Sequence, residues 1–177
     1  MNHISISYFK TPFGELILGS FKEELVLCDW RYRKMRDAVD SRIKKALNLD
    51  FKEEESEVIS DTKKQLNEYF SAERKEFDIP VLLLGTDFQK QVWEELVKIP
   101  YGKTNSYLEL SRKLNNEKAI RAVATANGAN AHSIIVPCHR IIGSSGELVG
   151  YAGGLAAKKS LLELENPSKD LQMDLFD

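Results

Sequence analysis

The residues best suited to chemistry stand together in the tetrapeptide Pro-Cys-His-Arg at positions 137–140. A thiol followed by an imidazole and a guanidinium brings together a nucleophile, a base and a positive charge. Residues 118–146 contain no Asp or Glu, but they contain one lysine and two arginines. We therefore expect a lowered pKa for Cys138, whereas a buried cysteine without such neighbours is usually inert.

The segments on either side of this tetrapeptide should hold it rigidly. Residues 134–136 and 141–142 are β-branched aliphatics, which favour extended, packed backbone. Proline cannot donate a hydrogen bond to a sheet and marks a strand end. The pattern predicts a thiol at a break between buried strands. On extended backbone the side chains of Cys138 and His139 would point apart, so that a water molecule would have to bridge them.

Two motifs together resemble the active-site segment of the O6-alkylguanine-DNA alkyltransferases. They are the tetrapeptide and the loop Gly-Tyr-Ala-Gly-Gly-Leu at 150–155. The resemblance runs from Thr86 to Glu165 and implies DNA repair by transfer of an alkyl group to the protein's own cysteine, once per molecule. The implied activity is that of a methylated-DNA–protein-cysteine S-methyltransferase, without metal or cofactor. The sequence leaves open the range of alkyl groups and the repair of O4-alkylthymine.

The resemblance assigns roles in the transfer reaction to four residues. Cys138 corresponds to the nucleophile and final alkyl acceptor. His139 and Glu165 correspond to the pair that removes the thiol proton through water, and Asn130 to the residue that holds the loop. His139 and Glu165 therefore act as a base and its partner, not as permanent acceptors.

The resemblance also implies contacts with a flipped nucleotide. Arg121, seventeen residues before Cys138, corresponds to the arginine that extrudes the damaged base, although a simple phosphate contact is the alternative. Tyr107 corresponds to the residue that crowds the phosphate and touches the guanine. The guanine pocket corresponds to Tyr151, Ala152, Gly153 and Gly154, with Lys158 reaching the loop from the next helix. Ala152 replaces the serine of some relatives and keeps only the backbone N–H, which bears on the acceptance of bulky alkyl groups.

Residues 86–165 should form a winged-helix or helix-turn-helix domain that binds DNA and carries the cysteine. Capping boxes at 86–89 and 106–109 begin two helices, and the first ends before Pro100. An Asn-Asn turn at 115–116 follows the second helix. It leads to the alanine-rich helix 119–126.

The alanine-rich helix is predicted to end in a left-handed Asn-Gly cap at 127–128. It lacks the long polar side chains with which a major-groove recognition helix reads bases. We therefore expect it to follow DNA shape, and the resemblance implies the minor groove. Packing of the alanines against a neighbouring helix is the simpler alternative.

Residues 1–85 should form a separate, supporting α/β domain, so that the whole chain has a mixed α/β (α+β) fold. Alternation and spacing predict strands at 4–8, 15–19, 24–29 and 79–84, helices at 35–47 and 58–69, and a charged loop at 51–56. No active site is recognisable here, and the domain resembles the small N-terminal domain of the same family only in outline.

Composition narrows the class further. The chain has 177 residues, 42% of them hydrophobic, with no apolar run of the roughly 20 residues that a membrane span needs. The N-terminus lacks the pattern of a signal peptide, and the two cysteines suit a reducing compartment, so we expect a cytoplasmic monomer. The net charge is −2 overall but +2 over residues 86–165, which predicts modest, salt-sensitive binding to double-stranded DNA.

Residues 166–177 form a tail that the alkyltransferase core does not need, and we expect it to be disordered. Its end, Gln-Met-Asp-Leu-Phe-Asp at 172–177, resembles the short peptides by which bacterial repair and replication proteins bind the sliding clamp. In this hypothesis Leu175 and Phe176 fill an apolar pocket, and Gln172 forms hydrogen bonds at its rim.

Three other functions compete with repair. A non-catalytic lesion-binding relative would lack the cysteine that stands here at position 138. A cysteine hydrolase would need an orienting third group and an oxyanion pocket, which no motif marks. A winged-helix regulator would leave the Pro-Cys-His-Arg tetrapeptide without a purpose.

Overall fold

The structure is a computed structural model that describes residues 2–168 and 172–173. The chain divides into two compact units, Met1–Gly85 and Thr86–Asp177. The predicted mixed α/β class is confirmed, with an N-terminal sheet unit and a mainly helical second unit. Among the described residues, no helix combines the length and apolar character needed to span a membrane.

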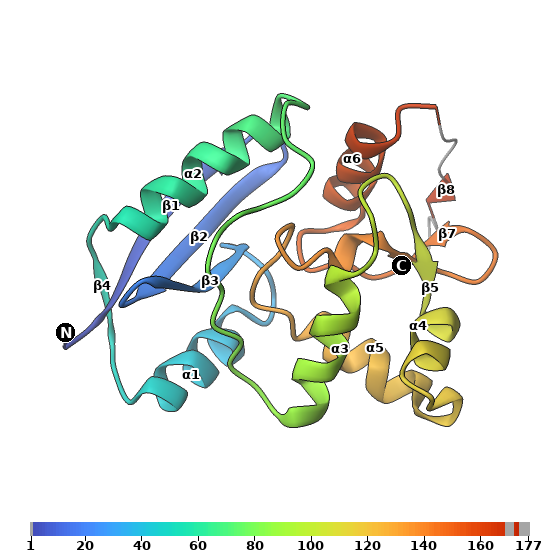
Figure 1. Ribbon diagram of the computed structural model, residues 1–177, viewed down its shortest axis with the longest axis horizontal. Helices are drawn as coiled ribbons and strands as arrows, with labels where there is room; N and C mark the ends of the chain where they lie inside the picture. Colours follow the sequence, from blue (N-terminus) through green and yellow to red (C-terminus); the bar gives the residue numbers. More distant parts are fainter. Residues whose placement is uncertain (1, 169–171, 174–177) are drawn as a thin grey trace. The chain divides into compact units, whose positions relative to one another are not determined.

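The first unit is built on a four-stranded sheet with the order β3-β2-β1-β4 (Figure 1). Its strands are β1 (Ile4–Thr11), β2 (Gly14–Phe21), β3 (Glu24–Trp30) and β4 (Phe51–Glu53). The first three are antiparallel and β4 runs parallel to β1. Pro12 and Phe13 form the turn between β1 and β2, and Lys22 and Glu23 form the turn between β2 and β3.

Two helices complete the unit, α1 (Arg36–Leu47) and α2 (Glu57–Phe70), and α2 packs against β1, β2 and β3. Ser56 caps α2 by accepting a hydrogen bond from the Ile59 amide. The helix buries one stripe of side chains, with Ile59, Thr62, Leu66 and Tyr69 all 0% exposed. Both predicted helices of this unit are therefore confirmed.

Two predictions for the first unit are wrong. The charged segment 51–56, expected to be a loop, contributes β4, because an edge strand pairs through its backbone and leaves Lys52 and Glu53 exposed. The segment 79–84, expected to be a strand, makes only one isolated bridge, between Val81 and Leu25. Pro80 lacks an N–H, and the segment bonds to a single residue of β3 through the Pro80 carbonyl and the Leu82 amide.

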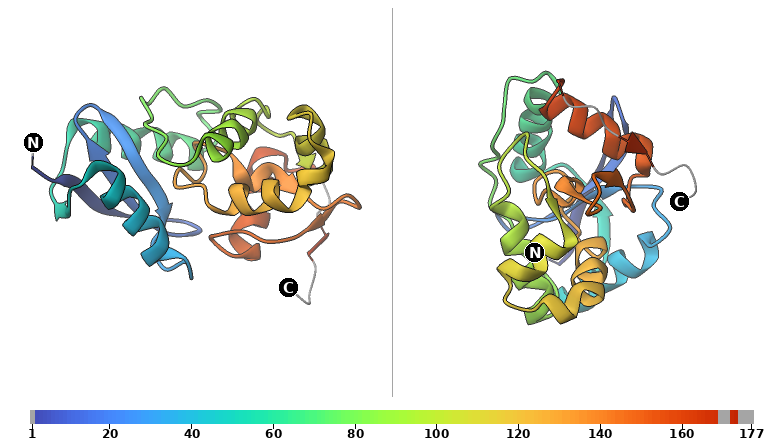
Figure 2. Two further views of the ribbon diagram at one scale, coloured as in Figure 1. Left: turned by 90° about the horizontal axis from the view of Figure 1, so that it is seen from below. Right: turned by 90° about the vertical axis from the view of Figure 1, so that its right-hand side faces the viewer.

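The second unit groups three helices, α3 (Asp87–Val97), α4 (Tyr107–Lys113) and α5 (Ile120–Gly128), which pack against one another (Figure 1; Figure 2). The fourth helix, α6 (Leu155–Glu165), packs against the segment that contains Cys138. Both predicted capping boxes are present, at Thr86 with Gln89 and at Ser106 with Glu109. The buried indole of Trp93 donates to the Ala126 carbonyl at 2.8 Å and ties α3 to α5.

The predicted end of the alanine-rich helix is wrong. Gly128 lies inside α5, and the cap is Ala129, whose φ of −85° and ψ of −2° are right-handed. Asn127 is buried, at 6% exposed, and does not take a left-handed conformation. An Asn-Gly pair tolerates such a turn but does not require it, because a helix can continue through both residues.

Two short parallel pairings complete the second unit. Strand β5 (Asn105–Ser106) pairs with β6 (Ile141–Ile142), and β7 (Glu147–Leu148) pairs with β8 (Gln172–Met173). The expectation that all of 166–177 is disordered therefore fails at Gln172 and Met173, whose backbone is paired. Leu175 and Phe176 lie outside the described residues.

Candidate active site

Cys138 lies on a short turn that ends at β6. Residues Cys138–Arg140 form one turn of 3-10 helix, and the Arg140 amide donates to the Pro137 carbonyl at 3.0 Å. The thiol residue is only 4% exposed. The predicted break in the backbone is present, and the extended backbone on which Cys138 and His139 would point apart is not found here. Proline, which cannot continue a ladder, is followed by a turn rather than a strand.

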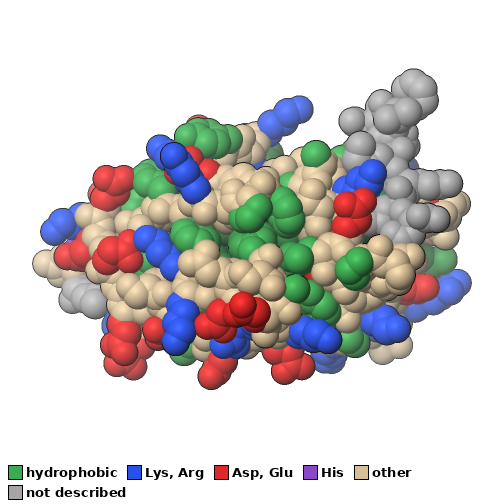
Figure 3. All heavy atoms as spheres, turned by 90° about the horizontal axis from the view of Figure 1, so that it is seen from above, with side chains coloured by type: hydrophobic (Ala, Val, Ile, Leu, Met, Phe, Trp, Pro, Cys, Tyr) green, Lys and Arg blue, Asp and Glu red, His purple; other side chains and the backbone are tan. Residues whose placement is uncertain are grey.

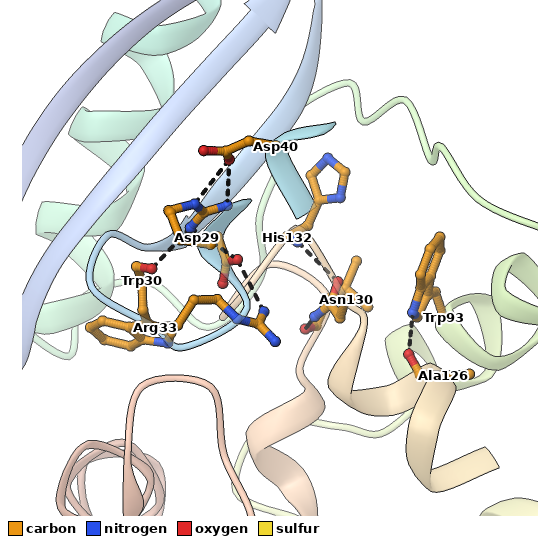
Figure 4. A network of polar contacts seen from close by, with 10 residues as sticks. Asp29, Trp30, Arg33, Asp40, Trp93, Ala126, Asn130 and His132 are labelled. Carbon is orange, nitrogen blue, oxygen red and sulfur yellow. Dashed lines mark hydrogen bonds and ion pairs between the residues drawn. The ribbon is translucent and has the colours of Figure 1, made fainter. Parts of the chain in front are cut away.

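The segment before Cys138 is fixed by Asn130. Its side-chain amide donates to the Val136 carbonyl at 2.8 Å, and its oxygen accepts from the His132 amide at 2.9 Å (Figure 4). The expected strand at 134–136 is absent, and Ile134 has a φ of +74°. A positive φ is strained for a β-branched residue. The two Asn130 bonds and a bond from the Val136 amide to the His132 carbonyl at 2.8 Å hold the segment in this turn.

Glu165, at the end of α6, binds both residues that follow the cysteine. His139 Nε2 lies 2.6 Å from Glu165 Oε2. Arg140 donates from Nε to Oε1 at 2.7 Å and from Nη2 to Oε2 at 3.1 Å, which is a bidentate pair. The His139 and Glu165 side chains are both 0% exposed. The structure thus brings together three charged or polar groups that lie 25 and 26 residues apart in sequence.

The surroundings set the protonation state of this group. Burial raises the pKa of Glu165, but hydrogen bonds and charges from His139 and Arg140 outweigh it and lower the pKa well below its usual range. Burial lowers the pKa of His139, although Glu165 opposes the effect. An ionised carboxylate can only accept, so Nε2 of a neutral His139 must donate to it. The other nitrogen, Nδ1, then carries a lone pair, and no described residue lies within hydrogen-bond distance of it.

The loop after α3 supports Glu165 from its other side. The Gly102 amide donates to Glu165 Oε1 at 3.3 Å, and Arg140 Nη1 donates to the Ile99 carbonyl at 2.7 Å. Gly102 has a φ of +78°, and a Cβ there would lie 3.1 Å from the Glu165 carbonyl oxygen. Glycine is required at this position for both reasons.

Lys158, on α6, is the second buried charge near the cysteine. It is 0% exposed, and Nζ donates to the carbonyls of Val149 at 2.9 Å and Gly150 at 3.2 Å. Burial lowers its pKa to about 8, against an opposing effect of Cys138. The expectation that Lys158 reaches the glycine-rich loop therefore matches its hydrogen bonds.

The two residues predicted to meet DNA lie on α4 and α5. Tyr107 begins α4 and is half-buried, and burial and the charge of Cys138 raise its pKa, against a hydrogen bond from Asn127. Arg121 lies in the first turn of α5 and is exposed. Its carbonyl accepts from Thr125 Oγ1 at 3.0 Å, a bond that does not involve the guanidinium. Tyr107 is thus coupled to the cysteine, whereas Arg121 stands on the surface.

The predicted pocket residues form the segment between β7 and α6. Tyr151 contacts His139 edge to face, with ring centroids 6.4 Å apart. Ala152 and Gly153 are partly exposed, and Gly154, with a φ of +90°, precedes α6. This segment is therefore joined to the cysteine turn through Tyr151 and to α6 through Lys158.

Sequence reasoning missed two features of the site. Arg140 was counted as a charge that favours the thiolate, but its guanidinium is bound to Glu165. Gly102 was read only as part of a turn. The available signal for Arg140 was its place beside His139, because two adjacent basic residues on one buried turn need a shared anion.

The described residues offer no metal site, since no group of three His, Cys, Asp or Glu side chains is placed to hold an ion. On the face drawn in Figure 3, basic and acidic side chains are interspersed and do not form one continuous basic patch.

Comparison with known proteins matches both units. Residues 4–83 match the ribonuclease-like domain of 6-O-methylguanine DNA methyltransferase, and residues 87–167 match its DNA-binding domain. A methylated-DNA–protein-cysteine methyltransferase of Mycobacterium tuberculosis is 52% identical over 113 residues, which cover 64% of this chain and 68% of that protein. The protein of that name from Methanosarcina acetivorans is 40% identical over 158 residues, covering 89% of this chain and 95% of the relative.

Solved structures agree with these relatives. The crystal structure of Mycobacterium tuberculosis OGT in complex with DNA has a TM-score of 0.79 and 38% identity, covering 92% of this chain and 93% of that one. The O6-methylguanine-DNA methyltransferase of Pyrococcus kodakaraensis has a TM-score of 0.61 and 26% identity, with coverages of 92% and 99%. On these matches, which extend over both units, the chain belongs to the 6-O-methylguanine DNA methyltransferase family.

Proposed function

We propose that this chain repairs DNA by transferring the alkyl group of O6-alkylguanine to Cys138, in a single turnover. The observation that carries the proposal is the buried turn on which Cys138 stands beside His139, which is itself bound to an ionised Glu165. The family supports the reaction class and DNA as the partner. A methylated-DNA–protein-cysteine methyltransferase needs an activated thiol and access to the lesion. We assign the activation to His139 and Glu165, and the access to Arg121.

Activation of the thiol begins at His139. Its Nδ1 has a lone pair, since Nε2 donates to Glu165, and it can take up a proton. We assign the Cys138 proton to His139 through one water molecule. Glu165 stabilises the imidazolium that forms, and Arg140 keeps Glu165 in place through two hydrogen bonds. The pair thus acts as a general base with an orienting carboxylate.

The transfer step is a displacement at the alkyl carbon. The Cys138 thiolate forms an S–C bond while the C–O6 bond breaks, and the electron pair of that bond goes to the guanine. The guanine takes up one proton and leaves as the neutral base, for which Tyr107 is the candidate donor at the start of α4. The product is a thioether, which is stable to water, unlike a thioester. No described group is placed to remove it, so each chain reacts once.

Access to the lesion requires the nucleotide to leave the base stack. Arg121 is exposed in the first turn of α5, and we assign it the role of filling the space that the extruded base leaves. The segment 150–154 then closes on the base, with Gly153 allowing close approach of its backbone. Ala152 offers only its N–H to the guanine oxygen.

The test is the intact mass of the protein after incubation with duplex DNA that contains O6-methylguanine. We expect a gain of one methyl group, about 14 Da, in wild type and none in Cys138→Ser, which should still bind the duplex. Undamaged duplex is the control. An unchanged wild-type mass with retained lesion binding would favour the non-catalytic function, and equal binding of undamaged DNA without transfer would favour a regulator.

We further propose that the C-terminal residues bind a bacterial sliding clamp. The hypothesis rests on the order of Gln172, Leu175 and Phe176 in the sequence, two of which lie outside the described residues. Two apolar side chains at the end of an acidic segment suit a small hydrophobic pocket. A short peptide that must be ordered on binding should reach micromolar affinity, about −8 kcal/mol.

Calorimetry tests the clamp hypothesis by titrating a peptide of residues 166–177 into a purified bacterial sliding clamp. Binding should be lost when Leu175 and Phe176 are both replaced by alanine, and it should persist in a control peptide with Ser168→Ala. No heat of binding at high micromolar concentration would overturn the hypothesis, as would binding that the double substitution leaves unchanged.

We also assign the reaction to a monomer in a reducing, cytoplasmic compartment. Neither Cys28 nor Cys138 is in a disulfide, and a thiol that must ionise and react cannot be stored as one. Sedimentation of the chain with and without a short duplex tests the monomer. A dimer that persists upon dilution would contradict it.

A further inference from the structure

Lys158 is a buried cation that has no carboxylate partner among the described residues. It is 0% exposed, and its described hydrogen-bond partners are two backbone carbonyls, those of Val149 and Gly150. Among the described residues, no carboxylate oxygen lies within 4.0 Å of its Nζ. A buried ammonium costs several kcal/mol unless an anion or strong hydrogen bonds compensate it. The carbonyls supply part of this compensation, and a nearby anion would supply more.

The acidic and basic groups around α6 leave few candidates for that anion. Glu165, on the same helix, is bound by His139 and Arg140, both from the turn packed against α6. Glu147, on the adjacent strand β7, is not within ion-pair distance of Lys158. Glu163, also on α6, is half-exposed and lies 3.8 Å from Lys159. The remaining group that can carry a negative charge is Cys138, on the turn packed against α6.

Helix α6, which carries the buried Lys158, packs against the turn Cys138–Arg140, and two electrostatic effects agree with this placement. The charge of Cys138 opposes the lowering of the Lys158 pKa, and the charge of Lys158 contributes to the lowered pKa of His139. The lysine therefore favours a thiolate at Cys138 and disfavours a proton on His139. Both effects act on the proton that must leave the thiol.

We propose that Lys158 is the counter-ion of the Cys138 thiolate and that the same ammonium holds the pocket rim through the Val149 and Gly150 carbonyls. The proposal rests on the proposed function, in which Cys138 is the alkyl acceptor. Alkylation converts the thiolate into a neutral thioether, so it removes the anion and leaves Lys158 uncompensated. Lys158 thus links the charge of the nucleophile to the rim that closes over the base.

The first experiment measures the reaction of Cys138 with iodoacetamide as a function of pH, in chains that carry Cys28→Ala. Lys158→Met should shift the midpoint upward by about 1 unit and slow the reaction at neutral pH roughly tenfold. Lys159→Met is the matched control, because Lys159 is 41% exposed and 3.8 Å from Glu163. Its profile should not move. A Lys158→Met profile that coincides with the control would overturn the proposal.

The second experiment does not depend on the folding of Lys158→Met. The titration of the Lys158 side chain is followed by NMR in chains with isotope-labelled lysine, with Cys138 present or replaced by alanine. The midpoint should lie at about 8 with Cys138 and lower in Cys138→Ala, since the anion is gone. Equal midpoints would overturn the proposal. Neither experiment uses DNA, so a failure of methyl transfer and a failure of the counter-ion are separate results.

Discussion

The chain contains two buried cysteines in opposite electrostatic surroundings. Cys28 is 0% exposed and Cys138 is 4% exposed. Burial and the negative charge of the adjacent Asp29 raise the pKa of Cys28. Cys138 instead has Lys158 as a charged neighbour and His139 next in sequence. Burial alone therefore does not decide whether a thiol reacts, and the sign of the nearest charge does.

The same two regions each contain a buried carboxylate bound to basic side chains. Asp29 is bound to Arg33 at 3.0 Å and to Arg36 at 3.2 Å (Figure 4). Glu165 is bound to Arg140 and to His139. An arginine keeps its proton whatever its partner does, whereas a histidine can gain or lose one. The Asp29 cluster can thus only support the fold, while the Glu165 cluster can also move a proton.

The largest expected effect separates the two cysteines. Cys138→Ser should abolish methyl transfer, whereas Cys28→Ser should leave the transferred amount at one methyl per chain. The reason is that a hydroxyl at position 138 cannot be ionised by the same neighbours. Quench-flow assays with radiolabelled lesion DNA measure both variants. Transfer by Cys138→Ser, or a loss of transfer in a folded Cys28→Ser chain, would remove the distinction.

The next effect concerns the proton path. Glu165→Gln should slow transfer about 100-fold, because the imidazolium of His139 loses its stabilising charge. The rate–pH profile should also move to higher pH, since the thiol is then harder to ionise. The assay compares single-turnover rates between pH 6 and pH 9, as a rough working range. A profile with an unchanged midpoint would take Glu165 out of the proton path.

Stability should follow the same carboxylate. The pKa of Glu165 in the folded chain lies below its usual 4.5. Above that pH the carboxylate is ionised in both states and its contacts contribute fully. Below it the unfolded chain binds the proton first, so the contribution is lost as the pH falls. The destabilisation caused by Glu165→Gln should therefore be largest at neutral pH and shrink in acid, as urea unfolding would measure. Equal destabilisation at both pH values would contradict this.

A smaller effect should distinguish extrusion of the damaged base from the transfer reaction itself. Arg121→Ala should slow repair of the duplex by tenfold or more, because extrusion of a base costs a few kcal/mol. Its reaction with free O6-benzylguanine, if wild type accepts that base, should be unchanged. Arg112, exposed and paired with Glu117 on the surface, offers Arg112→Ala as a matched control. Equal losses on both substrates would indicate damage to the pocket.

The smallest effect on chemistry is expected in the first unit. Asp29→Asn should lower the free energy of unfolding by about 3 kcal/mol, since it removes the buried anion that Arg33 and Arg36 share. The methyl-transfer rate of the folded variant should stay within about twofold of wild type. Urea unfolding and single-turnover assays measure the two quantities. A large change in rate without a change in stability would show that this cluster takes part in the reaction.

Much of the fold could be predicted because its signals are local. The period-two alternation at 4–8 and the capping boxes at Thr86 and Ser106 each depend on a few neighbouring residues. The failures depend on distant partners. Strand β4 forms because β1 offers its edge, and the turn at Ile134 forms because Asn130 bonds across it. The residues of each segment alone do not reveal that β1 or Asn130 will be its partner.

The candidate site shows the same limit. The tetrapeptide pointed to Cys138, but the absence of acidic residues from 118–146 suggested that Arg140 would favour the thiolate. Glu165, from outside that window, binds Arg140, and Lys158, also from outside it, is the cation coupled to the cysteine. Which charged side chains surround Cys138 depends on the fold. Counting the charged residues near it in the sequence therefore identifies the wrong cation.

The central claim, a single methyl transfer to Cys138, is tested most directly by locating the methyl group. Duplex DNA with deuterated O6-methylguanine is supplied in excess, and peptides that contain each cysteine are quantified by mass spectrometry over time. The label should accumulate on Cys138 to one group per chain and then stop, with none on Cys28. Label on Cys28, or more repaired lesions than protein chains, would contradict the account.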